Sequence, residues 1–288
     1  YAVTANGLTN PNYKLSDSPG TTYSVTPAPL SVSVADGLAI GKVYDGTTNV
    51  ESGDTAGGLV VKGLQNGETA AASGTWTYDT AHAGTGKTVS VIGISIAYGT
   101  ADPGNYSFEA APLAATGEIT RKEITPVIDL SPAPPYAYTG AQIAPAYTVK
   151  DGGTPLTAGD YEGVFSDNVD AGTARLTVTA GEAGNYSFAP AEKTFTIHPR
   201  PLAAAWENRD SWVYDGLPHA PAATAETGVA GEIVKLAVSG AETDAGTGYT
   251  AAAGIAFVTG GRAKAENYTL TNAAKDFAIA QRPAVLTW

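Results

Sequence analysis

The sequence predicts an all-β fold built from tandem β-sandwich domains, and three observations support this. Apolar and polar residues alternate with a period of two in short segments rich in β-branched residues, such as Val89-Ser90-Val91, Leu176-Thr177-Val178-Thr179 and Thr194-Phe195-Thr196-Ile197. No long stretch shows the 3.6-residue apolar period of a helix. The 34 glycines and 18 prolines place turn signals between these segments along the whole chain. Short strands separated by frequent turns are typical of β-sandwiches.

The chain contains an internal repeat, marked by Asn-Tyr followed by a short alternating segment. The mark returns at intervals of roughly 80–90 residues, and a junction with basic residues or proline follows each copy. Such a period is too long for a solenoid unit and suits a small autonomous domain, so we expect tandem copies of one module. The four copies are Asn12-Tyr13, Asn105-Tyr106, Asn185-Tyr186 and Asn267-Tyr268.

Two further landmarks recur between successive Asn-Tyr copies, always in the same order. A Tyr-x-Gly turn comes first and an Ala-Gly-Thr corner follows it. The order predicts three complete repeats at 30–121, 122–199 and 200–281, with residues 1–29 as the end of an earlier repeat and 282–288 as the start of a later one. The turns are Tyr44-Asp45-Gly46, Tyr138-Thr139-Gly140 and Tyr214-Asp215-Gly216, and the corners are Ala83-Gly84-Thr85, Ala171-Gly172-Thr173 and Ala245-Gly246-Thr247.

Composition and charge exclude several classes of protein. The chain has no cysteine, so disulfides and thiol chemistry are excluded, and a disulfide-free array of small domains is typical of bacterial surfaces. The net charge of −12 disfavours nucleic-acid binding. No apolar run approaches the roughly 20 residues that span a bilayer, so we expect no membrane insertion within this sequence. We expect a secreted protein on the bacterial cell surface.

The segment around the first Tyr-x-Gly turn resembles a known family. Lys42-Val43-Tyr44-Asp45-Gly46-Thr47-Thr48, Gly104-Asn105-Tyr106-Ser107-Phe108 and Gly117-Glu118-Ile119-Thr120 resemble the YDG repeat of bacterial surface proteins. The second and third repeats are similar to the related MBG family, through Tyr138-Thr139-Gly140 with Gly184-Asn185-Tyr186 and Tyr214-Asp215-Gly216 with Glu266-Asn267-Tyr268. The resemblance implies tandem Ig-like β-sandwich domains, arranged end to end in large adhesin-like envelope proteins, and implies no catalytic activity.

The residues themselves predict no enzyme, cofactor or metal centre. The three histidines, His82, His198 and His219, fall at different places in their repeats, and no nucleophile elbow or phosphate-binding loop is present. Asp167-Asn168-Val169-Asp170, Asp151-Gly152-Gly153 and Asp102-Pro103-Gly104-Asn105 offer loop oxygens to calcium. They lack the density of a dedicated calcium loop, and we interpret them as Asx turns; whether calcium binds at the junctions stays open.

The Asn-Tyr-Ser/Thr triplets also fit the pattern for N-glycosylation. We interpret them as a recurrent strand start, with the asparagine in the turn and the tyrosine in the core.

Aromatic residues near the Tyr-x-Gly turns offer an alternative, ligand-binding function. Tyr136 and Trp212 each stand two residues before the turn tyrosine, on the same strand face, and Trp206 extends the second stripe. Core packing is the favoured interpretation of these rings. Lys42 occupies the equivalent place in the first repeat, which predicts partial exposure there.

Two functional hypotheses follow. The first is a non-catalytic stalk, in which neighbouring repeats are the partners, the chain is a monomer, and the array projects a distal binding domain. The alternative is an adhesin or carbohydrate-binding module whose exposed aromatics bind a glycan or a host surface protein. The stalk predicts that Tyr136 and Trp212 are buried, and the alternative predicts an aromatic stripe open to solvent.

Overall fold

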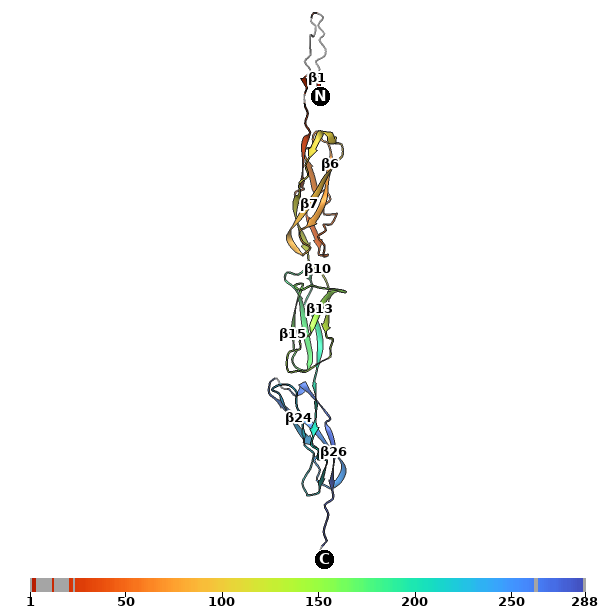
Figure 1. The fold of residues 1–288 in the computed structure, drawn as a ribbon, viewed down its shortest axis with the longest axis vertical. Coiled ribbons are helices and arrows are strands. Elements are labelled where there is room, and N and C mark those ends of the chain that lie inside the picture. Colours follow the sequence, from red (N-terminus) through yellow and green to blue (C-terminus); the bar gives the residue numbers. More distant parts are fainter. Residues whose placement is uncertain (1, 4–11, 13–20, 23, 262–263, 287–288) are drawn as a thin grey trace. The chain divides into compact units, whose positions relative to one another are not determined.

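The computed structural model describes residues 2–3, 12, 21–22, 24–261 and 264–286 (Figure 1). The all-β prediction is confirmed, because the helical elements among these residues are two 3₁₀ turns, η1 (Pro103–Asn105) and η2 (Ala265–Asn267). No helix in this part of the chain is long and apolar enough to cross a membrane.

Most of residues 1–29, the predicted end of an earlier repeat, lie outside the described residues. Within them β1 (Ala2–Val3) pairs antiparallel with β2 (Thr21–Thr22). Of the predicted later start at 282–288, residues 287–288 also lie outside.

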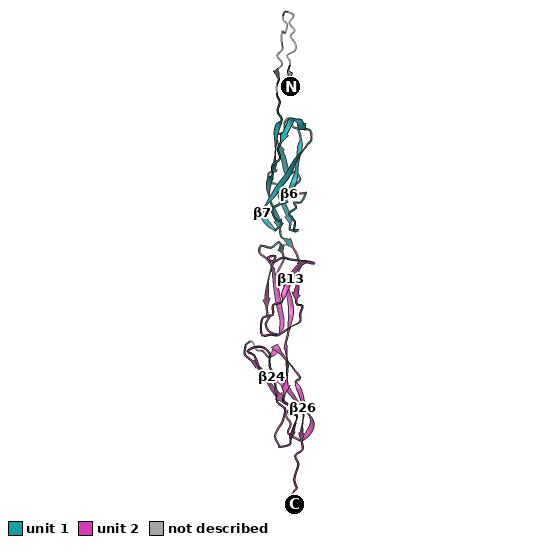
Figure 2. Cartoon of the chain, in the orientation of Figure 1, with its two compact units in different colours: residues 1–122, 184–186 teal, residues 123–183, 187–288 magenta. Residues whose placement is uncertain are grey.

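The chain forms two compact units (Figure 2). Unit 1 consists of residues 1–122 and 184–186, and unit 2 of residues 123–183 and 187–288. Residues 184–186, which carry the Asn-Tyr pair of the second predicted repeat, therefore belong to unit 1.

Unit 1 contains a four-stranded and a three-stranded sheet. In the four-stranded sheet, the strands that come first and last in the sequence pair in parallel, and the other neighbouring strands pair antiparallel. The four-stranded order is β4 (Ile40–Val43), β9 (Leu113–Thr120), β7 (Gly84–Tyr98), β6 (Ala70–Tyr78), and the three-stranded order is β5 (Leu59–Lys62), β3 (Ala28–Val34), β8 (Tyr106–Phe108). A short pair, β10 (Lys122–Glu123) with β17 (Tyr186–Ser187), spans the boundary of the two units in sequence.

Unit 2 contains two further four-stranded sheets with the same pattern of pairing. Their orders are β12 (Tyr136–Ala137), β18 (Ala191–His198), β16 (Gly172–Ala180), β15 (Tyr161–Ser166), and β21 (Ser211–Val213), β26 (Ala274–Ala280), β24 (Gly246–Thr259), β23 (Ile233–Ser239). The smaller sheets are β11 (Pro126–Ser131), β13 (Ala146–Asp151), β14 (Thr154–Pro155); β19 (Arg200–Ala203) with β25 (Tyr268–Thr271); and β20 (Ala205–Trp206) with β22 (Ala223–Thr224).

The register of the three four-stranded sheets is also the same. In each, the isoleucine near the end of the last strand pairs with the corner glycine on one side and with the residue two before the turn tyrosine on the other. The same positions are therefore occupied by Lys42, Tyr136 and Trp212. The paired sets are Lys42, Ile119 and Gly84; Tyr136, Ile197 and Gly172; and Trp212, Ile279 and Gly246.

Alternating burial explains why these segments are strands. In β16, Ala174, Leu176 and Val178 are fully buried while the residues between them face outward or are partly covered. Leu176 and Val178 each contribute about 1.5–3 kcal/mol by leaving water. In unit 2 one core cluster combines Tyr138, Phe195 and neighbours with residues that follow residue 200, including Leu202, Val234 and Tyr268. That core is shared by the second and third predicted repeats.

The predicted partial exposure of Lys42 is wrong, because the side chain is buried. Its ammonium contacts Asp45 Oδ1 at 2.7 Å and donates to the Thr47 carbonyl at 2.8 Å and the Thr47 hydroxyl at 3.0 Å. The same nitrogen lies 5.7 Å from the centre of the Tyr78 ring. A charged group at this position is tolerated because the turn that follows it supplies its partners. The sequence pattern identified the position of Lys42 in the repeat, but it did not predict these partners.

We predict that Lys42→Met lowers the free energy of unfolding of unit 1 by about 1–3 kcal/mol, because the apolar stem is kept while the polar partners lose their donor. Chemical denaturation of the whole chain measures the change. Lys62→Met, at an exposed lysine on β5, is the matched control and should shift the value by less than about 0.5 kcal/mol. Equal effects of the two substitutions would contradict the assigned role of Lys42.

Candidate functional site

The Tyr-x-Gly turn has the same construction in all three copies. The tyrosine amide donates to a carbonyl at the end of the last strand, at 2.8–2.9 Å in each copy. In the third copy Asp215 Oδ1 accepts from the Leu217 amide at 2.9 Å, an Asx turn. The glycine takes a positive φ, +85° at Gly216, which favours glycine. The turn therefore fixes the tyrosine ring at one end of the sheet. The donating amides are Tyr44 to Thr120, Tyr138 to His198 and Tyr214 to Ala280.

In unit 2 the turn tyrosine of the second repeat meets the Asn-Tyr tyrosine of the third at one carboxylate. The Tyr138 hydroxyl donates to Glu232 Oε1 at 2.6 Å, and the Tyr268 hydroxyl donates to Glu232 Oε2 at 2.5 Å. All three residues are buried. The two rings meet edge to face with centroids 5.5 Å apart. Two charge-assisted hydrogen bonds thus hold a buried carboxylate between two repeats.

A tight loop positions Glu232. Gly231, at φ +80°, precedes it, and the backbone carbonyl of Glu232 accepts from the Thr227 hydroxyl at 2.9 Å. The loop also contacts the preceding turn, because a Cβ at Gly140 would collide with the Val229 side chain. Gly140 is thus required by its positive φ and again by the close approach of the third repeat.

A second set of bonds joins the corner of the second repeat to the asparagine of the third. The Ala171 amide donates to Asn267 Oδ1 at 2.7 Å, and Asn267 Nδ2 donates to Asp170 Oδ1 at 3.0 Å. Lys264 Nζ forms an ion pair with Asp170 Oδ2 at 2.5 Å. Asn267 is fully buried. The corner and the asparagine therefore form a second clamp beside the Glu232 carboxylate.

Unit 1 contains the same pair of contacts. The Ala83 amide donates to Asn185 Oδ1 at 3.0 Å, and His82 Nδ1 lies 3.3 Å from the same oxygen. The Tyr44 and Tyr186 rings meet edge to face with centroids 5.4 Å apart. Two contacts therefore recur. The corner amide donates to the asparagine of the following Asn-Tyr pair, and the ring of the turn tyrosine packs against the tyrosine of that pair. We name this arrangement the repeat junction.

The junction refines the interpretation of the Asn-Tyr pair. Tyr106 and Tyr268 are buried, as predicted for core tyrosines. Asn185 and Asn267 were expected only to make a turn, and both are instead buried partners of the preceding corner. That burial leaves neither side chain open to a glycan.

The acidic residue of the junction was not predicted from the sequence. Gly231-Glu232 has counterparts in Gly67-Glu68 and Gly159-Asp160, each just before a strand. In unit 1 the Tyr106 hydroxyl donates to Glu68, as Tyr268 does to Glu232. This recurrent Gly-acid pair was a usable signal, although it is short and its acid changes between Asp and Glu.

The aromatic candidates of the binding hypothesis are held by contacts within the chain. Trp212 is 7% exposed, stacks on His219 with centroids 5.6 Å apart and lies under the Arg209 guanidinium at 4.7 Å. Trp206 packs against the same cluster, and its indole N–H donates to the Asn272 carbonyl at 2.8 Å.

Tyr136 packs against a different core cluster and is only half-buried, so the burial that the stalk predicts is found for Trp212 and not for Tyr136. Its ring meets Phe195 edge to face, and its hydroxyl donates to the Pro132 carbonyl. The structure therefore brings Trp206 and Trp212 together and places Tyr136 apart from them.

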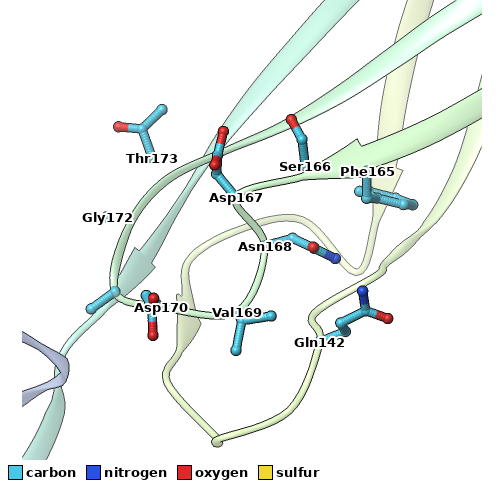
Figure 3. A pocket seen from close by; sticks show the side chains of 10 residues that line it. Gln142, Phe165, Ser166, Asp167, Asn168, Val169, Asp170, Gly172 and Thr173 are labelled. Carbon is cyan, nitrogen blue, oxygen red and sulfur yellow. The ribbon is translucent and has the colours of Figure 1, made fainter. Parts of the chain in front are cut away.

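The loop at Asp167–Asp170, considered for calcium, borders a depression of about 450 Å³ (Figure 3). Figure 3 shows the Asp167 and Ser166 side chains on one side of the loop and those of Val169 and Asp170 on the other. Asn168 Nδ2 donates to the Ile143 carbonyl, and Asp170 belongs to the junction. Among the described residues no three His, Asp or Glu side chains gather as metal ligands. Asp102, in another candidate loop, does form the predicted Asx turn, accepting from Gly104 at 2.9 Å.

We predict that Asn267→Ala lowers the free energy of unfolding of unit 2 by about 1–3 kcal/mol, because the Ala171 amide and Asp170 lose a buried partner. Hydrogen exchange at the Ala171 amide should accelerate as well. Asn105→Ala changes the same motif position where the side chain is exposed, and it should cost less than about 0.5 kcal/mol. An Ala171 amide that stays protected without Asn267 would refute the clamp.

The junction also predicts a loss of stability at alkaline pH. Burial, together with the hydrogen bond to Glu232 and its charge, raises the pKa of Tyr138 to about 12, and the same causes raise the pKa of Tyr268. Since a tyrosine in an unfolded chain has a pKa near about 10, this stabilisation is complete below that pH and is lost as the pH rises towards about 12. Urea denaturation at several pH values between about 10 and about 12 gives the free energy of unfolding as a function of pH. This free energy should fall less steeply with pH in the Tyr138→Phe, Tyr268→Phe double variant than in the unchanged chain. An equally steep fall in both would exclude the two phenols as the source of the pH dependence.

Comparisons with known proteins support part of the resemblance. Residues 26–114 match the family model of the YDG domain. No curated protein matches the chain. Among solved structures, the immunoglobulin domains 1–5 of Sidekick-1 match over 91% of this chain with 13% identity and a TM-score of 0.27, and the chain spans 60% of the length of that structure. The chain therefore contains a YDG domain at residues 26–114.

Proposed function

We propose that the chain consists of non-catalytic spacer repeats from an adhesin-like protein of the bacterial cell surface, and that these repeats project a distal binding domain. One observation carries the proposal. The residues that recur with the repeat period contact one another at the repeat junctions. In a spacer, the join between modules is the feature that every copy must reproduce.

The chemistry of the junction suits a spacer because it resists slippage. Sliding or bending at Glu232 would separate a buried carboxylate from its two donors, and an unpaired buried charge is costly. The linking segment His198-Pro199-Arg200-Pro201 restricts the backbone further, since proline fixes φ and biases the residue before it to extended forms. The join therefore favours one geometry.

The family context supports the cell-surface setting. A YDG domain is present, and the second and third repeats resemble the MBG family in the motifs that form the junctions. We propose that all three segments are Ig-like repeats, that neighbouring repeats are their partners and that the untethered chain is a monomer. The glycan or host-protein alternative needs accessible aromatic faces. The burial of Trp212 weighs against it, while Tyr136 is half-buried and does not.

Two measurements on the whole chain test the proposal. With repeats of roughly 30–40 Å each, estimated from strand rise, small-angle scattering should give a maximum dimension of at least about 100 Å. Glycan and matrix-protein arrays should show no saturable binding. Either a compact particle or reproducible array binding would overturn the spacer function.

A junction variant sharpens the scattering test. Tyr138→Ala removes the buried ring of the second repeat's turn and should broaden the distribution of dimensions. Tyr214→Ala makes the same change at the equivalent, exposed turn and serves as the control. Identical scattering from the two variants would show that Tyr138 does not fix the join.

A further inference from the structure

The turn end of a repeat carries its Tyr-x-Gly turn and its Ala-Gly-Thr corner, and the Asn-Tyr end carries its Asn-Tyr pair. We propose that the turn end of the third repeat is a docking surface for the Asn-Tyr end of another repeat, and that Asn105, Tyr106 and Glu68 of a second copy of this chain can occupy it. The surface consists of Tyr214, Asp244 and Ala245. The inference rests on the geometry of the repeat junction and is independent of the spacer function.

The turn end of the third repeat has the same built form as the other two junctions, and among the described residues no Asn-Tyr pair covers it. Tyr214 has the same backbone bond as Tyr138, yet it is 40% exposed where Tyr138 is 0% exposed. Val213 and Leu217 beside it are also exposed apolar residues. The equivalent turn end in unit 2 is covered by the Asn-Tyr end of the next repeat, which indicates what covers this one.

The corner of the third repeat shows the same difference. The amides of Ala83 and Ala171 donate to an asparagine of the following repeat. Ala245 occupies the same position, one residue before the glycine that pairs with the last-strand isoleucine. It is exposed, and within the described residues its amide has no hydrogen-bond acceptor. The corner therefore presents a donor at the place where the other two copies bind an asparagine oxygen.

The complementary groups lie at the other end of the first repeat. Asn105 is exposed, whereas Asn185 and Asn267 are buried in junctions. The Tyr106 hydroxyl donates to Glu68 Oε2, as Tyr268 does to Glu232. Over the part of the chain that is described, Glu68 Oε1 has no donor, while Glu232 Oε1 receives the Tyr138 hydroxyl. If a second tyrosine hydroxyl donated to Glu68 Oε1, both oxygens of this carboxylate would accept a hydrogen bond, as both oxygens of Glu232 do.

Each exposed group thus has its match. Tyr214 would donate to Glu68 Oε1, and the Ala245 amide would donate to Asn105 Oδ1. The contact is head to tail, so it does not close on itself and can be extended copy by copy. Between free chains it is weak, because within one chain the junction forms at the high effective concentration of a tether.

The test supplies that tether. In a duplicated chain, residues 1–281 of one copy are followed directly by residues 28–288 of the second. This join keeps the natural spacing, because Ala28 pairs with Tyr106 as Arg200 pairs with Tyr268, and because Arg282 follows Ile279 at the same distance as Arg200 follows Ile197. Amide exchange at Ala245 is then measured by NMR, and the Ala245 amide of the second copy serves as the internal reference.

We expect exchange at the first Ala245 amide to slow by at least about tenfold relative to the second. Asn105→Ala in the second copy should restore fast exchange while circular dichroism shows the fold unchanged. Equal exchange at the two Ala245 amides overturns the proposal. Slowed exchange that survives Asn105→Ala overturns it too, because a different contact would then be responsible.

Discussion

The structure of unit 2 depends on one buried carboxylate. Glu232 receives a phenolic hydrogen bond on each oxygen, one from the second predicted repeat and one from the third. A buried carboxylate needs its donors, so the two repeats are held in the one arrangement that supplies both. The core cluster around Tyr138 and Tyr268 and the Asn267 clamp are built beside this point.

This constraint gives the repeat motif a physical meaning. The glycine of the turn gives the φ that aims the tyrosine, and the corner exposes an amide for the next asparagine. The asparagine and tyrosine stand together because one accepts from the corner while the other reaches the acid. The landmarks are thus two complementary ends of a module, and their recurrence reflects the need of each end to fit its neighbour.

Much of the fold could be predicted from the sequence, because strand alternation and turn glycines are local signals. The contacts that join the repeats could not, since they link residues 94 and 96 positions apart. Local patterns gave the positions of Tyr138 and Asn267 without their partners. Lys42 was misjudged for a related reason, because its burial depends on acceptors supplied by its own turn. The Gly-acid pair escaped notice because two residues with a variable acid make a faint pattern.

The most direct test of the account is a double-mutant cycle between Tyr138→Phe and Tyr268→Phe, measured by the free energy of unfolding of unit 2. Each substitution removes one hydroxyl and leaves the ring in place. Because both hydroxyls share one carboxylate, the account predicts a coupling energy of at least about 0.5 kcal/mol between residues of different repeats. Additive effects would contradict it, because the two tyrosines would then not act through Glu232.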